Sequence, residues 1–219
     1  MPFRKPAPKL PETVNFTEEE SSFLDSIKPW TKEKWSDSFG TSDQNRIRNE
    51  IKAKIKTELK RIQDNYCAFC GLNLDLAYEV HREHVAPQYK YPDYIFEPEN
   101  LVLSCSFCNM FKKKKAYFVA DRNNRVGPKL YSNLTFEILH PHRDNFSDYL
   151  DCDFINLELI FTIIDPNSGK TQKTINCVGL EEPHLITQRG AIILKDLLKG
   201  DPVLSAYVDA IISRNRKRN

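Results

Sequence analysis

The sequence predicts an α+β fold made of several helices and a few short strands, and three observations favour this class. Isoleucine and leucine recur at helical spacing between residues 47 and 62. Two apolar runs, at residues 156–164 and 171–178, have the length of strands. Two Cys-x-x-Cys pairs lie between these regions. With 219 residues, 40% of them hydrophobic, the chain is long enough to bury a sizeable core.

The composition excludes several classes of protein. The seven glycines stand at least ten residues apart, so the glycine-rich loops that bind dinucleotides or nucleoside triphosphates and the Gly-x-Ser-x-Gly elbow of hydrolases are absent. No apolar run approaches the roughly 18 residues of a transmembrane helix. The N-terminal stretch MPFRKPAPKLPE has no apolar core of a signal peptide. We therefore expect a soluble, cytoplasmic protein that does not bind a membrane.

The first 65 residues predict an extended arm followed by two helices. Prolines at positions 2, 6, 8 and 11 favour an extended arm over residues 1–16. Thr17 and Glu20 have the spacing of a capping box, which starts a short helix that ends before Pro29. Ser42 or Asp43 is expected to cap a second helix, whose apolar stripe consists of Ile47, Ile51, Ile55, Leu59 and Ile62.

The C-terminal part of the chain predicts a strand pair followed by two helices. The expected strands at 156–164 and 171–178 are joined by a turn at residues 166–169, where Pro-Asn-Ser-Gly favours reversal of the chain. Helices are expected at about 181–199 and 202–215, and Gly-Asp-Pro at 200–202 separates them.

Four of the six cysteines form two pairs, Cys67–Cys70 and Cys105–Cys108. A Cys-x-x-Cys pair wraps one turn of chain around a metal ion, and two such pairs complete a tetrahedral four-sulfur site that suits structural Zn²⁺. Disulfides are the alternative, but they are rare in the cytoplasm and the doubled spacing favours a metal. Cys152 and Cys177 have no partner pattern and are expected in the core.

The segments around the cysteine pairs carry a further motif. Between the pairs lie Tyr78-Glu-Val-His-Arg-Glu-His-Val-Ala-Pro87 and then Phe96-Glu-Pro-Glu-Asn-Leu-Val-Leu-Ser-Cys105, and the second pair is followed by Asn109-Met-Phe-Lys-Lys113. In this order the segments resemble the HNH nucleases, a class with a ββα-metal core enclosed by zinc-binding cysteines. The matching pattern is an acid–histidine pair, Asn-Leu shortly before a cysteine pair, Asn or His directly after that pair, and then lysine.

The resemblance implies a division of the chain into four parts. Residues 66–119 would form the HNH nuclease core with its four-cysteine zinc site. An N-terminal arm and short helix (1–40) and the amphipathic helix (41–65) would precede it, and residues 120–219 would support the core or dock a partner. The implied fold is α+β, with a ββα-metal core flanked by N-terminal helices and by a C-terminal strand pair plus helices.

The resemblance also implies a site for metal-dependent hydrolysis of phosphodiester bonds. His84 would take a proton from water as the general base. Glu83 and Asn109 would hold a catalytic Mg²⁺ or Mn²⁺ through oxygen ligands, in addition to the structural zinc. Asn100 would hydrogen-bond to backbone and fix the loop that presents His84. Most HNH motifs have aspartate at the position of Glu83, which places the carboxylate differently here.

Several residues near this motif have open interpretations. Lys112 and Lys113 begin a lysine- and arginine-rich stretch and are expected to contact nucleic-acid phosphates, although a lysine run is also typical of a solvated helix face. His81 is a reserve candidate for the base or a ligand, and its alternative is a strand histidine with a satisfied hydrogen bond. The remaining histidines, His140, His142 and His184, are expected to be structural or exposed.

The Glu-His pair, where most HNH motifs have Asp-His, resembles the pair found in one HNH subgroup. This subgroup is PtuB, the effector nuclease of Septu and some retron anti-phage systems. The tail also resembles this subgroup, in segments 139–149 and 174–180 and at Arg189. The resemblance implies an ABC-type ATPase partner (PtuA-like) and a DNA or RNA substrate. Two alternatives remain: a zinc-stapled nucleic-acid-binding or interaction module without catalysis, and an interaction subunit whose nuclease fold has lost activity.

Overall fold

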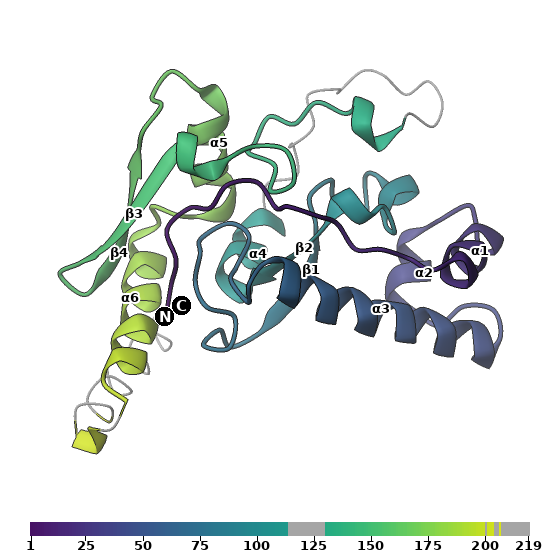
Figure 1. The fold of residues 1–219 in the computed structure, drawn as a ribbon, viewed down its shortest axis with the longest axis horizontal. Coiled ribbons are helices and arrows are strands. Elements are labelled where there is room, and N and C mark those ends of the chain that lie inside the picture. Colours follow the sequence, from purple (N-terminus) through teal and green to yellow (C-terminus); the bar gives the residue numbers. More distant parts are fainter. Residues whose placement is uncertain (114–129, 200, 204–205, 207–219) are drawn as a thin grey trace.

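The computed structural model of the chain describes residues 1–113, 130–199, 201–203 and 206. These residues form a mixed α+β fold with two separate two-stranded antiparallel sheets, which confirms the predicted class (Figure 1). The helices are α1 (Glu18–Ser26), α2 (Lys32–Ser36), α3 (Ser42–Ile62), α4 (Ser106–Lys113), α5 (Gly169–Val178) and α6 (Pro183–Leu197), and the strands are β1 (Val80–His84), β2 (Leu101–Cys105), β3 (Leu150–Ile155) and β4 (Glu158–Ile163).

α1 begins as the sequence predicts. The hydroxyl of Thr17 accepts a hydrogen bond from Glu20 N, and the Glu20 carboxylate accepts one from Thr17 N. This reciprocal pair satisfies two N–H groups that would otherwise lack partners at the helix start. The helix ends at Ser26, before Pro29, so this prediction is confirmed.

α3 begins at a different residue from the predicted one. Its N-cap is Thr41, whose hydroxyl accepts from Gln44 N while Gln44 Oε1 accepts from Thr41 N. The predicted caps, Ser42 and Asp43, therefore lie inside the first turn, and this prediction is corrected. Of these three residues, only Thr41 is followed three positions later by a glutamate or glutamine, here Gln44. This pair completes a second capping box.

The apolar stripe of α3 faces the core, as predicted. Its side chains pack in one hydrophobic cluster that also includes β2, the cysteine knuckles and parts of the C-terminal region. Ile51, Ile55, Leu59 and Ile62 are buried, and Ile47 is partly buried. Cys152 and Cys177 also lie in this core, which confirms their prediction.

β1, β2 and α4 follow one another as strand, strand and helix at the centre of the molecule (Figure 1). The two strands pair antiparallel, with Glu83 opposite Val102 and His84 opposite Leu101. All five residues of β2 are buried, whereas most of β1 is half-buried. α4 starts directly after β2, so the second cysteine pair straddles a strand–helix junction.

β3 and β4 form a hairpin, and this pairing replaces the predicted one between residues 156–164 and 171–178. The run 156–164 was expected to be one strand, but Asn156 and Leu157 have φ of 51° and 68° and form the turn. A two-residue hairpin turn of type I′ requires such positive φ values at both central residues, and asparagine tolerates them well. The strand pair therefore combines residues 150–155 with 158–163.

The segment 171–178, expected to be a strand, is helical and belongs to α5. Four of its five buried residues, Thr171, Thr174, Ile175 and Val178, recur at spacings of three and four, and Cys177 is the fifth. This is the period of a helix, and it outweighs the β-branched composition that favoured a strand. Gly179 ends α5 in the left-handed conformation, with φ of 64°. The turn at 166–169 thus leads into a helix.

α6 packs along the β3–β4 hairpin (Figure 1). Gly190 permits this contact, because a Cβ there would collide with the backbone of Leu157 and Glu158. The predicted helix at 181–199 is confirmed with slightly shorter bounds, while most of the one expected at 202–215 lies outside the described residues. Within the described part of the chain, no helix combines the length and apolarity that crossing a membrane requires.

The N-terminal arm crosses the body of the molecule and connects its two ends (Figure 1). Phe3 forms a β-bridge with Leu72 beside the first cysteine pair. Lys5 forms an ion pair of 3.0 Å with Asp151 of β3, and Leu10 N donates to Pro141 O. These contacts, with the prolines, hold the arm in the extended form that the sequence predicts.

Gly190→Ala should lower the free energy of unfolding by about 1–3 kcal/mol, because the added methyl overpacks the contact between α6 and the hairpin turn. Gly169→Ala is the matched control, since a Cβ there has no atom within 4 Å. Urea denaturation of both variants measures the difference, and equal stability of the two would contradict the close approach at Gly190.

Candidate functional site

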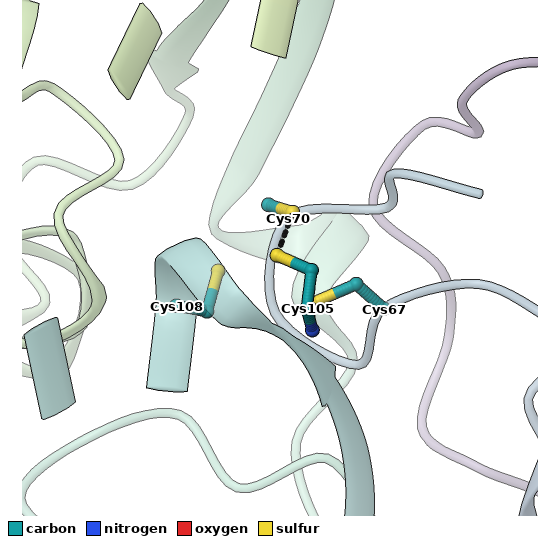
Figure 2. Close-up of side chains that lie close together, drawn as sticks. All are labelled: Cys67, Cys70, Cys105 and Cys108. Carbon is teal, nitrogen blue, oxygen red and sulfur yellow. Dashed lines mark hydrogen bonds between the residues drawn. The ribbon is translucent and has the colours of Figure 1, made fainter. Parts of the chain in front are cut away.

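The two predicted cysteine pairs meet in one buried cluster. The Sγ atoms of Cys67, Cys70, Cys105 and Cys108 all lie within 4.8 Å of one another, and Figure 2 shows the four side chains gathered around the β2–α4 junction. The cysteines are free, with 3.6 Å between the sulfurs of Cys70 and Cys105. Sulfurs bound tetrahedrally to Zn²⁺ at about 2.3 Å would lie about 3.8 Å apart. The cluster can therefore hold a structural metal such as zinc.

Local backbone structure presents the two pairs to each other. Cys67 O accepts from Gly71 N at 3.1 Å, which closes the first knuckle. Gly71 has φ of 69°, and a Cβ there would collide with Arg4 O, so this turn requires glycine. Cys105 ends β2 and Cys108 lies in the first turn of α4, where the free N–H groups of the helix favour negative charge on sulfur.

A second feature is a pocket of about 240 Å³ beside β1 and α4. It contains the acid–histidine pair and the asparagine that follows the second cysteine pair, which are far apart in sequence. The lining residues are His81, Arg82, Glu83, His84, Pro87, Gln88, Tyr89, Asn109 and Lys112. Four of the predicted site residues, Glu83, His84, Asn109 and Lys112, thus share one pocket.

His84 is oriented by two contacts. Its Nε2 lies 3.0 Å from Ile95 O, and its ring packs edge-on against Trp35 with 4.5 Å between centroids. Because a carbonyl oxygen only accepts, Nε2 carries the proton of this hydrogen bond. The lone pair is therefore on Nδ1, which accepts no hydrogen bond from the described residues. Burial lowers the pKa of His84 to about 4, and the neighbouring Glu83 only partly offsets this. The imidazole is therefore neutral at pH 7 and can accept a proton at Nδ1.

Lys112 lies inside the site. Its Nζ is 2.5 Å from Glu83 Oε1 and 2.5 Å from His84 O, and its side chain is 2% exposed. The ammonium thus links α4 to the end of β1. This arrangement directs the ammonium to Glu83. A contact between Lys112 and a nucleic-acid phosphate stays a prediction. Lys113 is the last residue of α4, and its side chain lies outside the described part of the structure.

Asn109 presents an unsatisfied acceptor in the same pocket. The residue is 3% exposed, and its Oδ1 has no hydrogen-bond partner among the described residues. Buried polar atoms almost always have a partner, so such an atom indicates a ligand or a water. Amide and carboxylate oxygens are the donors that hard divalent cations use. Asn109 together with Glu83 offers such donors on one pocket wall.

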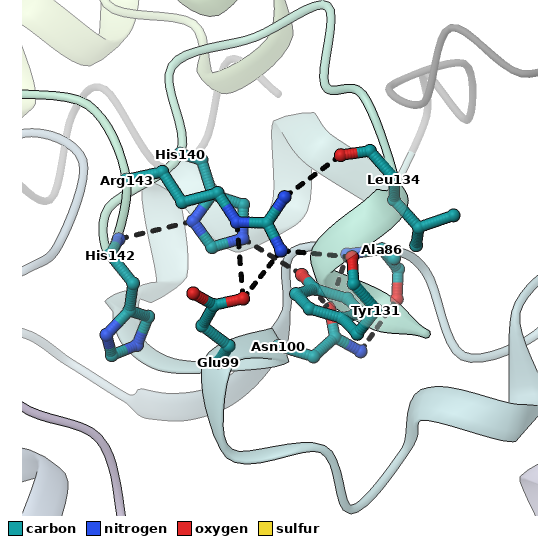
Figure 3. A network of polar contacts seen from close by, with 8 residues as sticks. All are labelled: Ala86, Glu99, Asn100, Tyr131, Leu134, His140, His142 and Arg143. Carbon is teal, nitrogen blue, oxygen red and sulfur yellow. Dashed lines mark hydrogen bonds and ion pairs between the residues drawn. The ribbon is translucent and has the colours of Figure 1, made fainter. Parts of the chain in front are cut away.

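Asn100 makes the backbone hydrogen bonds that the sequence analysis expects of it (Figure 3). Its Oδ1 accepts from Ala86 N at 2.6 Å, and its Nδ2 donates to Ala86 O at 3.2 Å and to Tyr94 O at 2.8 Å. Ala86 lies two residues after His84. Asn100 therefore fixes the chain that leaves β1, and it does not itself line the pocket.

A chain of hydrogen bonds supports Asn100 from the C-terminal region (Figure 3). His140 Nδ1 accepts from His142 N, so its Nε2 carries the proton and donates to the Tyr131 hydroxyl at 2.9 Å. That hydroxyl in turn donates to Asn100 Oδ1 at 2.9 Å. Arg143 adds an ion pair of 2.5 Å with Glu99. His140, Tyr131 and Asn100 are thereby linked in one chain of hydrogen bonds.

Comparison with protein-family models and with curated proteins found no match for this chain. Its resemblance to the HNH nucleases therefore rests on the motif segments. The geometry adds that these segments come together in space.

The other histidines divide as expected. His140 and His142 are buried and hydrogen-bonded, so they are structural, and His184 is exposed on α6. His81 lines the pocket with Nε2 3.2 Å from Glu79 Oε2, and both of its interpretations remain open.

Sequence reasoning did not find the residues that support the site from a distance. Trp35 and Tyr131 belong to segments without any recognisable motif, yet they contact His84 and Asn100. Arg82 lies inside the motif, but no spacing rule singled it out as a pocket residue. Only a predicted contact between segments far apart in the sequence could have identified Trp35 and Tyr131.

Cys67→Ser should remove most bound metal and destabilise the core, because structural metal binding is coupled to folding. The matched control is Cys177→Ser, which alters a buried cysteine outside the cluster. Elemental analysis should find about one metal ion per chain in the wild type and in the control, and much less in Cys67→Ser. A folded wild type without metal would contradict the assignment.

Proposed function

We propose that this protein is a metal-dependent HNH-type endonuclease that hydrolyses phosphodiester bonds in nucleic acid. One observation carries the proposal: a neutral histidine with a free Nδ1 lies in the same pocket as Glu83 and the unsatisfied Asn109 Oδ1. A base beside oxygen donors for a hard cation is what phosphodiester hydrolysis requires.

In this proposal each residue has one role. His84 Nδ1 accepts the proton of the attacking water, while Ile95 O holds the imidazole in the required tautomer. Glu83 and Asn109 would hold Mg²⁺ or Mn²⁺, and the ion would stabilise negative charge on the phosphate and the leaving oxygen. Lys112 orients the Glu83 carboxylate, and Asn100 positions the chain after His84.

Arg82 is proposed as a phosphate contact of the pocket. It is half-buried, and among the residues that the structure describes its guanidinium donates to Lys52 O at 3.1 Å and pairs with no carboxylate. Lys52 lies near it, and burial together with Arg82 and Arg48 lowers the pKa of Lys52 to about 8. Cations that lack a counter-charge favour an anionic ligand, and the backbone of nucleic acid supplies one.

One observation favours the second candidate, a binding module without catalysis. Lys112 pairs with Glu83 so closely that the carboxylate is already partly neutralised. A divalent ion would therefore bind Glu83 less strongly than it binds an unpaired carboxylate. The four-cysteine cluster and Arg82 are compatible with a nuclease and with a binding module. Only an assay for hydrolysis distinguishes the two functions.

The proposed biological role rests on the sequence resemblance alone. We propose that the protein is the effector nuclease of a PtuB-like anti-phage system, acts in the cytoplasm and works in complex with a PtuA-like ABC-type ATPase. The chain has no Walker A motif of its own, which is consistent with a separate subunit that binds the nucleotide.

His84→Ala should lower the cleavage rate by about 10²–10⁴-fold, because it removes the general base. The assay uses DNA and RNA substrates with Mg²⁺, Mn²⁺ or EDTA, with the protein alone and with an ATPase encoded beside it. His184→Ala is the matched control, since it alters an exposed histidine on α6. Binding of nucleic acid without cleavage in any combination would favour the binding module.

Arg82→Gln should weaken binding to all sequences and reduce the salt dependence of binding by about one counterion. Arg46→Gln is the matched control, because Arg46 is an exposed arginine already paired with Glu50 at 2.9 Å. Fluorescence anisotropy in EDTA measures both variants without hydrolysis. An equal salt dependence in Arg82→Gln and wild type would contradict a phosphate contact.

A further inference from the structure

A buried arginine from α6 lies against the cysteine cluster. Arg189 is 0% exposed, and its Nη2 is 3.7 Å from Cys108 Sγ. The same guanidinium donates to three backbone oxygens at the end of α5: Val178 O at 3.4 Å, Gly179 O at 3.0 Å and Leu180 O at 3.5 Å. It also lies over the ring of Phe107, which stands between Cys105 and Cys108 in the sequence.

The burial of this charge requires a counter-charge. A cation moved from water into a protein interior loses several kcal/mol of hydration free energy unless an anion or oriented dipoles replace it. No carboxylate among the described residues pairs with Arg189. The carbonyl oxygens that end α5 carry only partial negative charge. The nearest group that can carry a full negative charge is Cys108.

The metal-loaded cluster has the counter-charge that Arg189 requires. Four thiolates around a divalent ion carry a net charge of −2. Hydrogen bonds to ligand atoms are also known to tune the affinity of metal sites. Arg189, in contact with Cys108 Sγ, is therefore matched in charge to the metal-loaded cluster.

We propose that Arg189 is a positioning residue of the four-cysteine metal centre, which compensates the charge of the thiolates and ties α6 to them. The metal ion then stabilises more than the two knuckles. Through Arg189 it also holds the end of α5 and the whole of α6 in place, although neither helix contributes a ligand. This inference rests on the cysteine cluster and is independent of the nuclease proposal.

The first test compares metal affinities of the full chain by competition with a chromophoric zinc chelator. Arg189→Gln should bind Zn²⁺ about 10–100-fold more weakly than wild type, the usual effect of losing a partner of a metal ligand. Arg189→Lys keeps the charge and should lose much less affinity. Arg48→Gln is the matched control, because Arg48 is another buried arginine that donates to backbone oxygens, remote from the cysteines. Unchanged affinity in Arg189→Gln, or equal losses in Arg189→Gln and Arg189→Lys, would overturn the proposal.

A second measurement uses only the wild type, in case Arg189→Gln fails to fold. Hydrogen exchange of amides in α6 is compared between the zinc-loaded and the chelator-treated protein, with α1 as the internal reference. Protection of α6 should fall at least tenfold more than that of α1, since α1 packs at the other end of the molecule (Figure 1). An equal change in the two helices, whether none or complete, would overturn the link between the metal and α6.

Discussion

Strand β2 is the constraint on which the rest of the structure depends. Its five residues are all buried between β1, α3 and the neighbouring loops. Asn100 immediately precedes it and Cys105 ends it, so one short strand separates the residue that fixes the pocket from the metal cluster. Because a strand rises about 3.3 Å per residue, the two lie within about 20 Å of each other. A shift in β2 would disturb both sites at once.

The C-terminal region contributes to both sites from a distance. Tyr131 and His140 complete the hydrogen bonds of Asn100, and Arg189 reaches the cysteine cluster. Buried polar networks of this kind are stabilising only when every member is satisfied, which makes them sensitive to the loss of one. The region after residue 130 therefore acts as structural support for the centre, and support is one of the two roles that the sequence resemblance implies for it.

Local signals in the sequence predicted much of the fold. The capping box at Thr17 and the apolar stripe of α3 depend on residues that are neighbours along the chain. Within each Cys-x-x-Cys pair, the short spacing itself brings the two sulfurs close together. Prediction failed where local signals conflicted. β-branched residues favoured a strand at 171–178, but burial against α4 selected the helical period. Thr41 was missed because Ser42 and Asp43 are equally good caps by type.

The candidate site was predictable as a set of residues but not as an arrangement. Motif spacing brought Glu83, His84 and Asn109 into consideration, and the pocket contains all three. The spacing gave no indication that Lys112 would pair with Glu83, because this contact depends on the angle at which α4 leaves β2. The supporting residues Trp35, Tyr131 and Arg189 approach from segments far away in the sequence, and no local pattern encodes such contacts.

The charge of the pocket limits which ligands it can bind. Arg82 and Lys112 are cationic, and Glu83 is the one acidic residue among the described residues of the lining. The pKa of His84, lowered to about 4 by burial, leaves it neutral at pH 7. With Lys112 paired to Glu83, Arg82 has no carboxylate partner among the described residues. This balance of charge favours an anionic ligand over a cationic one. Catalysis requires one property more, a base that is neutral and has a free lone pair, and the hydrogen bond from His84 Nε2 to Ile95 O gives His84 that property.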